Sequence, residues 1–517
     1  MKIQAEIPFV ELNILPSLTK DFVRDGAEFS YGKKYHSNKV GAEMDTMGFE
    51  QNKRSILVAA LLSQYADVNV TPPEIIQKLE DESTFTITTG HQLCLFTGPL
   101  YLVYKIATVI HMTDQLNDLY PNNSFVPVFW MATEDHDFEE VSKVNIFQDT
   151  ITWKDQQQGG VGRMSITNMQ SAFDDLKELL KVNGQEFIEL IGESLTVNNV
   201  AQHYRKLIHG LFGDRIVILD ADDPTLKSMF VNTAITELDG VSFQALNKTN
   251  KEFEKTGYVS QINGRPINLF WMQDGSRERI LKNSKGFEIN GQKQQYTKEE
   301  MIQMFRKSPE SVSPNVVLRP VYQQLILPNL AYVGGGGELA YWLQLEEVFK
   351  QLNVYYPMLQ VRTSFSIIKE KWLKKWSNLG LEEKNFFSNP DQLKKQFAIN
   401  DNGFSFNEEQ TDLNALLVQI KSKAFAIDKS LEDTVGAESR KIEKGLDRIE
   451  KKIIKALKNK SERNLNQIDK ILLMIKPNGV LQERYASIFE MFSSPDEISE
   501  LIELADPTND TMKILVS

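Results

Sequence analysis

The chain has 517 residues, of which 41% are hydrophobic and 25% are charged, close to the averages for globular proteins. This composition excludes a fibrous repeat and a wholly disordered chain, and the length suggests roughly three folding units. The 70 acidic residues outnumber the 58 lysines and arginines, which leaves a net charge of −12. Because a nucleic-acid-binding surface would work against this negative field, we expect no nucleic-acid partner.

Three further features concern the compartment of the protein. The most apolar runs, such as residues 56–62, are far shorter than the roughly 20 residues of a membrane span. The first ten residues include Glu6 and lack the basic and apolar regions of a secretory signal. The single cysteine, Cys94, excludes an internal disulfide and a cysteine-rich metal site. We therefore expect a cytoplasmic protein with no membrane partner and no metal site.

Short apolar runs alternate with helical patterns through the first two thirds of the chain. Near-continuous apolar runs that end in small or acidic residues are typical of strands buried on both faces of a parallel sheet. Helical patterns follow the first run at 99–116 and the fourth at 338–352. This alternation predicts an α/β fold with a doubly wound, Rossmann-like parallel sheet. The predicted strands are 84–90, 124–135, 215–223, 330–338 and 354–361.

The long gaps between these strands indicate insertions in the core. Residues 257–296 contain short strand-like runs separated by NGR, DGS and NSKG, which are hairpin turn signals. We expect a small antiparallel insertion there. The catalytic core would then occupy residues 1–365, a helical coiled-coil domain 366–476, and a C-terminal helical segment returning to the core 477–517.

Heptad spacing of apolar residues marks the helical domain. Two narrow apolar seams flanked by charged residues predict a coiled coil over residues 408–475, and a phase slip near Val435 and Gly436 indicates a stutter or a turn. One continuous helix would reach on the order of 100 Å, whereas a hairpin could fold back near Gly436 or near 458–461. Either form leaves apolar surface that favours a homodimer. The two seams are Leu413, Leu417, Ile420, Ala424, Ile427 and Leu431, then Val435, Ile442, Leu446, Ile449, Ile453 and Ala456.

The first predicted strand ends in polar residues and is followed by a helix start. Ligands of open α/β sheets lie beyond the carboxyl ends of the strands. Thr97, Gly98 and Pro99 are expected to open the next helix with a capping hydroxyl, and unpaired N–H groups there would suit a phosphate or a carboxylate. Either His91 donates to such an anion or it only forms hydrogen bonds within a loop. The candidate residues here are Gly90, His91, Gln92, Thr97, Gly98 and Lys105, whereas Cys94 fits a buried small hydrophobe.

Two more strand ends carry candidate residues. Four ionisable residues follow the second strand and could bind an ammonium group, a sugar hydroxyl or a divalent cation, although acids in this place also cap helices. Four glycines follow the fourth strand and would let the backbone approach an anion. Just before that strand, Arg319 could hold a carboxylate through two hydrogen bonds or could form a core-edge ion pair. These candidates are Glu134, Asp135, His136, Asp137, Gly334, Gly335, Gly336, Gly337, Asn315, Arg319 and Gln323.

Four strings of this sequence together resemble the cysteine-adding enzymes of bacillithiol biosynthesis, the BshC family. They are TGHQLCLFTGPLYLVYK (89–105), PVFWMATEDHDFEEV (127–141), SPNVVLRPVYQQLILPNLAYVGGGGELAYW (313–342) and PNGVLQERY (477–485). The resemblance implies a Rossmann-type core similar to class I synthetases, with a coiled coil used for dimerisation. It implies a ligase that joins cysteine to the amine of glucosaminyl-malate, an amino-sugar malate conjugate.

In the resemblance, Gly90, His91 and Gln92 match the place of the synthetase His motif. From the positions at the strand ends, we expect His91 to donate to a phosphate or an oxyanion and the glycines 334–337 to cradle an anion. Glu134 and Asp137 would hold or deprotonate the attacking amine. The energy source stays open, with ATP or another nucleotide as candidates, because no lysine-rich KMSKS-like loop precedes the last strand. Two alternatives are a nucleotidyltransferase or adenylate-forming ligase acting on another small carboxylate, and a coiled-coil scaffold without catalysis.

Overall fold

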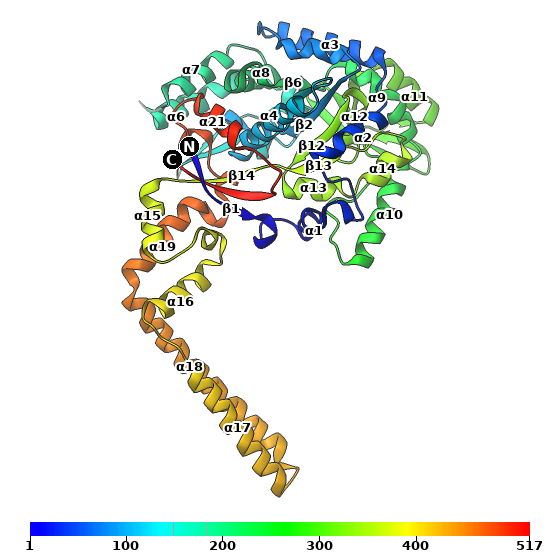
Figure 1. Cartoon of the computed structure of the whole chain (residues 1–517). Helices are drawn as coiled ribbons and strands as arrows, with labels where there is room; N and C mark the ends of the chain where they lie inside the picture. The colour runs from blue at the N-terminus through cyan, green and yellow to red at the C-terminus, as the bar shows by residue number, and fades with distance from the viewer. Residues whose placement is uncertain (148, 182–183) are drawn as a thin grey trace. The chain divides into compact units, whose positions relative to one another are not determined.

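The computed structural model describes residues 1–147, 149–181 and 184–517. It divides into two compact units, which are described separately: residues 1–367 with 482–515, and residues 368–481 with 516–517. The first unit contains a five-stranded sheet whose neighbouring strands are all parallel (Figure 1). The predicted Rossmann-like core is therefore confirmed. Its strands, in spatial order, are β13 (Met358–Val361), β12 (Asn329–Gly334), β2 (Thr84–His91), β3 (Ser124–Met131) and β6 (Val217–Asp220).

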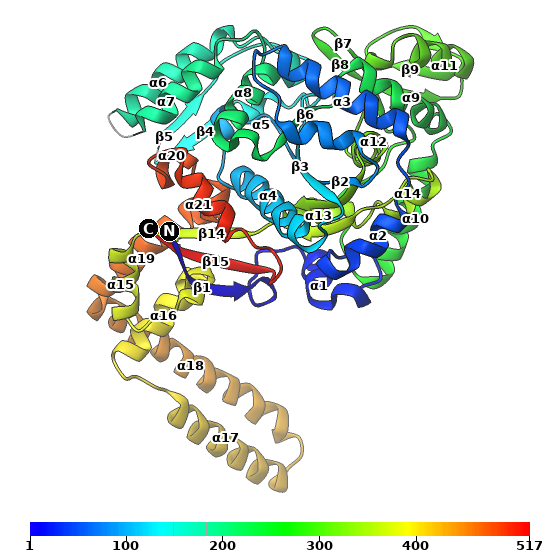
Figure 2. The same cartoon turned by 45° about the horizontal axis from the view of Figure 1, so that its top comes forward.

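Helices cover both faces of this sheet because its strands are apolar on both sides. Successive side chains of a strand point to opposite faces. Phe129 of β3 contacts Tyr204 of α8 (Val200–Phe212), whereas the adjacent Trp130 contacts Tyr322 of α12 (Arg319–Ile326). The helix α4 (Tyr101–Leu119) packs its apolar residues on β2 and β3 (Figure 2). The sheet is thus the middle layer of three.

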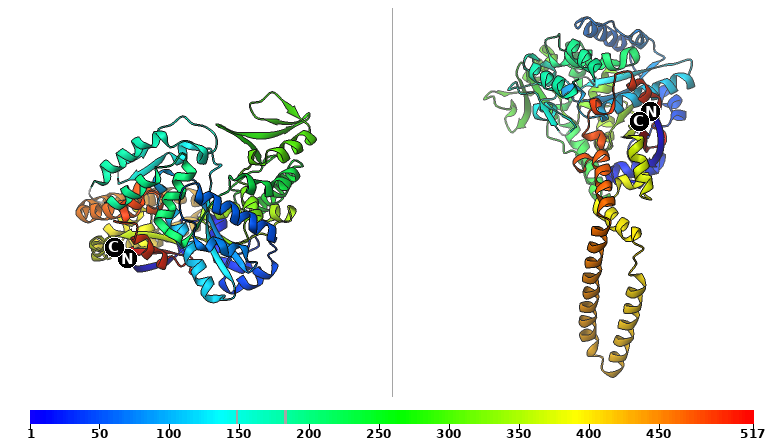
Figure 3. Two further views of the ribbon diagram at one scale, coloured as in Figure 1. Left: turned by 90° about the horizontal axis from the view of Figure 1, so that it is seen from above. Right: turned by 90° about the vertical axis from the view of Figure 1, so that its left-hand side faces the viewer.

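An antiparallel sheet follows in the stretch where an insertion was expected. The strands β7 (Leu269–Gln273) and β8 (Ser276–Asn283) turn at Asp274 and Gly275, and Gly275 has a φ of 71° that favours glycine. Figure 3 (left) shows this part of the chain in green. The full order is β10 (Gln295–Tyr296), β9 (Gly286–Ile289), β8, β7 and β11 (Val312–Pro314).

The end of the chain adds helices and a strand to the first unit. Two helices, α20 (Ile488–Met491) and α21 (Glu497–Leu504), precede β15 (Thr511–Val516). This last strand lies between β1 (Lys2–Pro8) and β14 (Ser364–Ile368). Among the described residues, no helix is both long and apolar enough to cross a membrane.

The second unit is helical and contains the predicted coiled coil as a hairpin of two helices (Figure 3, right). The chain reverses at Asp428, whose backbone is extended and whose carboxylate accepts a hydrogen bond from the Ser430 N–H at 2.8 Å. Neither of the two reversals considered from the sequence is correct. The helix α18 (Leu431–Lys460) runs through Gly436, and residues 458–461 mark only the end of this helix. The helices of the unit are α15 (Glu370–Asn378), α16 (Pro390–Asp401), α17 (Asn407–Ile427), α18 (Leu431–Lys460) and α19 (Glu462–Ile475).

Candidate functional site

The candidate site lies where the direction of the sheet's connections reverses. The chain enters the sheet at β2, proceeds through β3 and β6 on one side, and then returns to β12 and β13 on the other side. The reversal therefore falls between β2 and β12, and ligands of such sheets bind beyond the carboxyl ends of the strands at that point. These ends are His91 on β2 and Gly334 on β12, with Arg362 directly after β13.

His91 is enclosed by Cys94 and Tyr101. Its Nε2 lies 3.8 Å from the Cys94 sulfur, and its ring meets the Tyr101 ring edge-on at 4.9 Å between centroids. Burial lowers the pKa of His91 well below its usual value, and the positive charges of Lys105 and Arg362 lower it further. His91 is therefore a neutral imidazole at pH 7, able to donate one hydrogen bond or to accept a proton. Burial also raises the pKa of Cys94 to about 12, so this thiol is not a nucleophile.

A buried ion pair joins the ends of β2 and β12. The Lys105 ammonium donates to the Gly90 carbonyl at 2.8 Å and to the Glu338 carboxylate at 2.5 Å. Glu338 also accepts from the Tyr332 hydroxyl and, at 3.3 Å, from the Gly335 N–H. Burial opposes the charge of Glu338, but Lys105 and Tyr332 hold its pKa below its usual value. Lys105 thus positions the backbone of both strand ends.

A second buried ion pair lies at the end of β13. Both terminal nitrogens of Arg362 donate to the Glu483 carboxylate, at 2.6 and 2.9 Å. The two side chains are 4% and 2% exposed, so the pair is held away from water. The guanidinium of Arg362 also lies over the Tyr101 ring, 5.7 Å from its centroid. The backbone N–H of Arg362 donates to the Gly334 carbonyl. Arg362, Tyr101 and His91 therefore form a continuous wall.

The four glycines after β12 differ in what surrounds them. A Cβ atom at Gly334 would come within 2.9 Å of Leu339, and one at Gly336 within 2.5 Å of Leu15, so these two glycines allow close packing. Gly335 and Gly337 have open space or only a distant neighbour. At these two positions an added side chain would meet no close neighbour.

Three candidate residues in or just before α12 have different surroundings. The Arg319 guanidinium is surrounded by the rings of Trp130, Tyr332 and Trp342 at 5.6–5.8 Å, and it donates to Gln323 at 3.3 Å. Asn315 instead lies in the turn before α12, where its side chain accepts from the Val317 N–H and donates to the Asn268 side chain. Arg319 and Gln323 can therefore face a ligand more readily than Asn315 can.

The acidic residues that follow β3 have different hydrogen-bond partners. Glu134 is buried and pairs with the ammonium of Lys227, which also donates to the Val312 carbonyl. Asp135 accepts a hydrogen bond from Gln92 at 2.7 Å. Asp137 caps the helix α5 (Phe138–Val141) by accepting from the Glu140 N–H.

His136 lies on the rim, beside the antiparallel sheet. Its Nδ1 is 2.9 Å from Nη1 of Arg277, a residue of β8 whose guanidinium lies over the Phe270 ring at 4.0 Å. Burial and this arginine lower the pKa of His136. The insertion thus contributes directly to one side of the strand ends.

The expected helix cap at Thr97 is wrong. The helix α4 begins at Tyr101, after Leu100, and no side chain caps its first turn. Thr97 has a φ of 76°, and its buried hydroxyl has no hydrogen-bond partner within the described chain. Gly98 has a φ of 63°, and a Cβ there would lie 2.6 Å from that of Cys94. The turn is tight because Phe96, Thr97 and Gly98 all adopt left-handed backbone conformations.

Sequence reasoning missed several charged residues of this edge. Arg362 follows the last apolar run directly, and Asp220 and Asp222 follow the third, so the strand-end rule applied to every strand would have found them. Asp220 accepts from the Thr133 hydroxyl at 2.6 Å, and Asp222 pairs with Arg163. Glu483 gives no such signal, because it is remote in sequence and lies in no strand.

Two other features bear on ligands. Among the described residues, no cluster of three or more His, Cys, Asp or Glu side chains is arranged to hold a metal ion.

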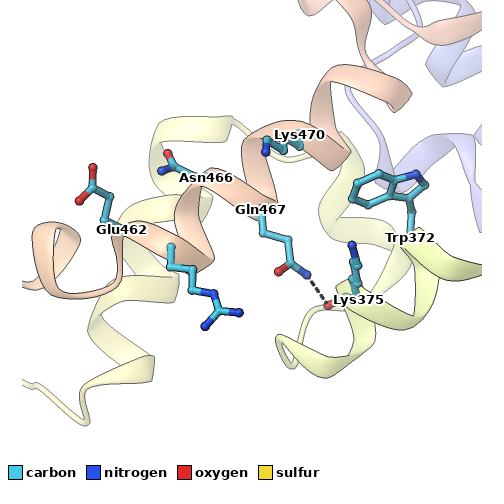
Figure 4. Close-up of a pocket in the computed structure, with 7 residues that line it drawn as sticks. Trp372, Lys375, Glu462, Asn466, Gln467 and Lys470 are labelled. Atoms are coloured by element: carbon cyan, nitrogen blue, oxygen red, sulfur yellow. Dashed lines mark hydrogen bonds between the residues drawn. The ribbon is translucent and has the colours of Figure 1, made fainter.

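A cavity of about 500 Å³ lies in the helical unit, where Gln467 donates to the Lys375 carbonyl at 3.4 Å (Figure 4). Its lining comes from surface helices rather than from strand ends, and consists of Trp372, Lys375, Glu462, Arg463, Asn466, Gln467 and Lys470.

Comparison with known proteins gives matches over both parts of the chain. The family described as "Bacillithiol biosynthesis BshC, N-terminal Rossmann-like domain" matches residues 6–363, and "Bacillithiol biosynthesis BshC, C-terminal coiled-coil domain" matches 365–517. Three relatives bear the name "Putative cysteine ligase BshC". The one from Flavobacterium psychrophilum is 37% identical and covers 94% of each chain. Those from Flavobacterium johnsoniae (36%, covering 87% of this chain and 86% of the relative) and Christiangramia forsetii (34%, 98% of each) are similar.

Proposed function

Because the chain belongs to the bacillithiol biosynthesis BshC family, we propose that it is a cysteine ligase that joins L-cysteine to the amine of glucosaminyl-malate. The match extends over both the parallel-sheet core and the coiled coil, and this carries the proposal. The strand-end residues His91, Lys105 and Arg362 support it, because these groups suit carboxylate-bearing substrates. Such a biosynthetic enzyme would act in the cytoplasm.

The reaction forms one amide bond from a carboxylate and an amine, with the overall loss of water. This condensation is uphill in water, so the cysteine carboxylate must be activated by ATP or another donor. The positive charges of Lys105 and Arg362, each of which is also held by a carboxylate, suit the negative groups of such a donor. No geometry for the donor itself is implied.

Within this proposal the chain's residues have distinct tasks. His91, as a neutral imidazole, donates a hydrogen bond to the oxyanion that develops on the attacked carboxyl carbon. One oxygen of Glu134 is held by Lys227, which leaves the other to accept a hydrogen bond from the attacking amine. Asp137 would assist from the start of α5, and Gln92, Asp135, His136, Arg319 and Gln323 would line the substrate.

A product assay tests the proposal. The purified protein is incubated with L-cysteine, glucosaminyl-malate and each nucleoside triphosphate in turn, and the thiol product is sought by mass spectrometry. Formation of the cysteinyl conjugate is the expected result. No product with any donor, while substrates still bind, contradicts it. Pyrophosphate release with another carboxylate would then indicate an adenylate-forming ligase, and no ligand-induced thermal shift at all would indicate a scaffold.

The helical unit supports a second part of the proposal, a homodimer. Ile420, Ile442 and Ile449 remain 44%, 48% and 53% exposed although they belong to the predicted heptad seams. Isolated apolar side chains are common on surfaces, but a repeated row on two long helices is typical of an interface. A second copy of the chain would bury this row.

A further inference from the structure

The Nε–H group of the Arg362 guanidinium has no hydrogen-bond partner among the described residues. An arginine carries five N–H donors. The terminal nitrogens of Arg362 serve the Glu483 carboxylate, the Thr363 carbonyl and the Ser364 hydroxyl. The Nε atom is buried and has no hydrogen-bond partner in the described part of the chain. A buried donor without an acceptor is costly, so its retention points to a ligand that supplies one.

The free Nε faces the backbone of Gly335. A Cβ atom placed on Gly335 would have Nε as its nearest neighbour, at 3.9 Å, with no other atom within 4 Å. The φ and ψ of Gly335 are −75° and 162°, an extended conformation that any residue adopts. Glycine is therefore not required here by the backbone, and a methyl group at this position would meet the unpaired donor in van der Waals contact.

The surroundings of this space select for negative charge. The Glu483 carboxylate is occupied by Arg362, and the Glu338 carboxylate by Lys105 and Tyr332. The neutral His91 ring lies on the other side of Tyr101. The ends of β2 and β12 meet here, which is where open sheets bind their ligands.

We propose that Arg362 and Gly335 form an oxyanion subsite, in which Arg362 Nε donates a hydrogen bond to a carboxylate or phosphate oxygen of a bound substrate. This rests on the proposed function, because both substrates carry carboxylates and the activating donor carries phosphates. Glu483 holds the guanidinium so that Nε points into the space beside Gly335. The subsite is distinct from Gly334 and Gly336, where an added Cβ atom would clash with neighbouring side chains.

Gly335→Ala is the sharpest test, because it fills the space but leaves the Arg362–Glu483 pair and the backbone conformation intact. Binding of L-malate, L-cysteine, ATP and inorganic phosphate is measured by titration calorimetry on the full-length protein. We expect an unchanged melting temperature and a loss of affinity of about tenfold to a hundredfold for at least one probe, as for a lost hydrogen bond to a charged group. Gly48→Ala, in a loop with no atom within 4 Å of the new methyl group, is the matched control and should bind like the wild type.

The probes distinguish the source of the oxyanion. Weaker binding of L-malate or L-cysteine alone assigns the subsite to a carboxylate, and weaker binding of ATP or phosphate alone assigns it to a phosphate. Arg362→Lys, which keeps the positive charge but lacks Nε, should weaken the same probe. Wild-type affinity for every probe in a folded Gly335→Ala variant overturns the subsite, as does a wild-type protein that binds none of them. Because the readout is binding, it separates this inference from a failure of the ligase assay.

Discussion

Among single residues, replacement of His91 tests the proposed chemistry most directly. Removing one hydrogen-bond donor to a developing oxyanion typically lowers turnover about a hundredfold to a thousandfold. His91→Ala should show such a loss in the product assay and keep the wild-type melting temperature. Cys94→Ala, which removes only the neighbouring inert sulfur, should keep turnover close to the wild-type rate. Turnover of His91→Ala at the wild-type rate would show that the imidazole has no part in the reaction.

Asp220 predicts a pH dependence of stability. Burial and the neighbouring Asp222 raise the pKa of Asp220 from 3.8 to about 6. Between these values the folded state binds more protons than the unfolded state, so the free energy of unfolding falls as the pH rises through this window. Asp220→Asn keeps the acceptor for Thr133 and removes the charge. Between pH 5 and pH 8 the wild type should therefore lose about 1 kcal/mol more stability than the variant.

Urea unfolding at both pH values measures this difference. The histidines titrate in the same range, but they are unchanged between the two proteins and cancel in the comparison. Equal pH dependence in wild type and Asp220→Asn would mean that the carboxyl of Asp220 titrates near its ordinary value.

At the scale of elements, the two helices of the hairpin show how a heptad pattern can predict helices without locating their turn. Gly436 lies inside α18 with open space around it, so its lack of a side chain only weakens the helix. Gly436→Ala should raise the free energy of unfolding by roughly 0.5–1 kcal/mol. Gly403→Ala should lower it, because Gly403 has a φ of 61° that disfavours a side chain. Thermal unfolding followed by circular dichroism compares the two, and a destabilising Gly436→Ala would place a turn there.

At the scale of the whole molecule, the exposed heptad row predicts a dimer that a single charge should disrupt. Ile449 is 53% exposed on α18, so Ile449→Glu should not disturb the fold of one chain but would bury a carboxylate in the interface between two. Analytical ultracentrifugation at micromolar concentration should show a dimer for the wild type and a monomer for the variant. Lys452→Glu, on an exposed position of the same helix, is the control for the change of charge. A monomeric wild-type protein would refute the interface.

The sequence alone determined the features that depend on neighbouring residues. Each strand of the parallel sheet is an apolar run whose burial on both faces follows from its composition, and the long helices follow from their heptads. The order of the strand ends along the chain was therefore enough to predict a Rossmann-like core and to place Gly90, His91 and the glycine run at one edge. The motifs that carry the family resemblance lie in these same segments.

Tertiary structure alone decided which charges meet. Glu134 finds Lys227 at a separation of 93 residues, and Arg362 finds Glu483 at 121, so no local spacing could reveal either pair. A charge taken out of water must be paired, but its partner is chosen by the route of the chain. The left-handed conformation of Thr97 and the hairpin turn at Asp428 likewise became known only from the structure. The unpaired Nε–H of Arg362 became visible only in the tertiary structure, because Glu483, the carboxylate that holds the terminal nitrogens, is remote in the sequence.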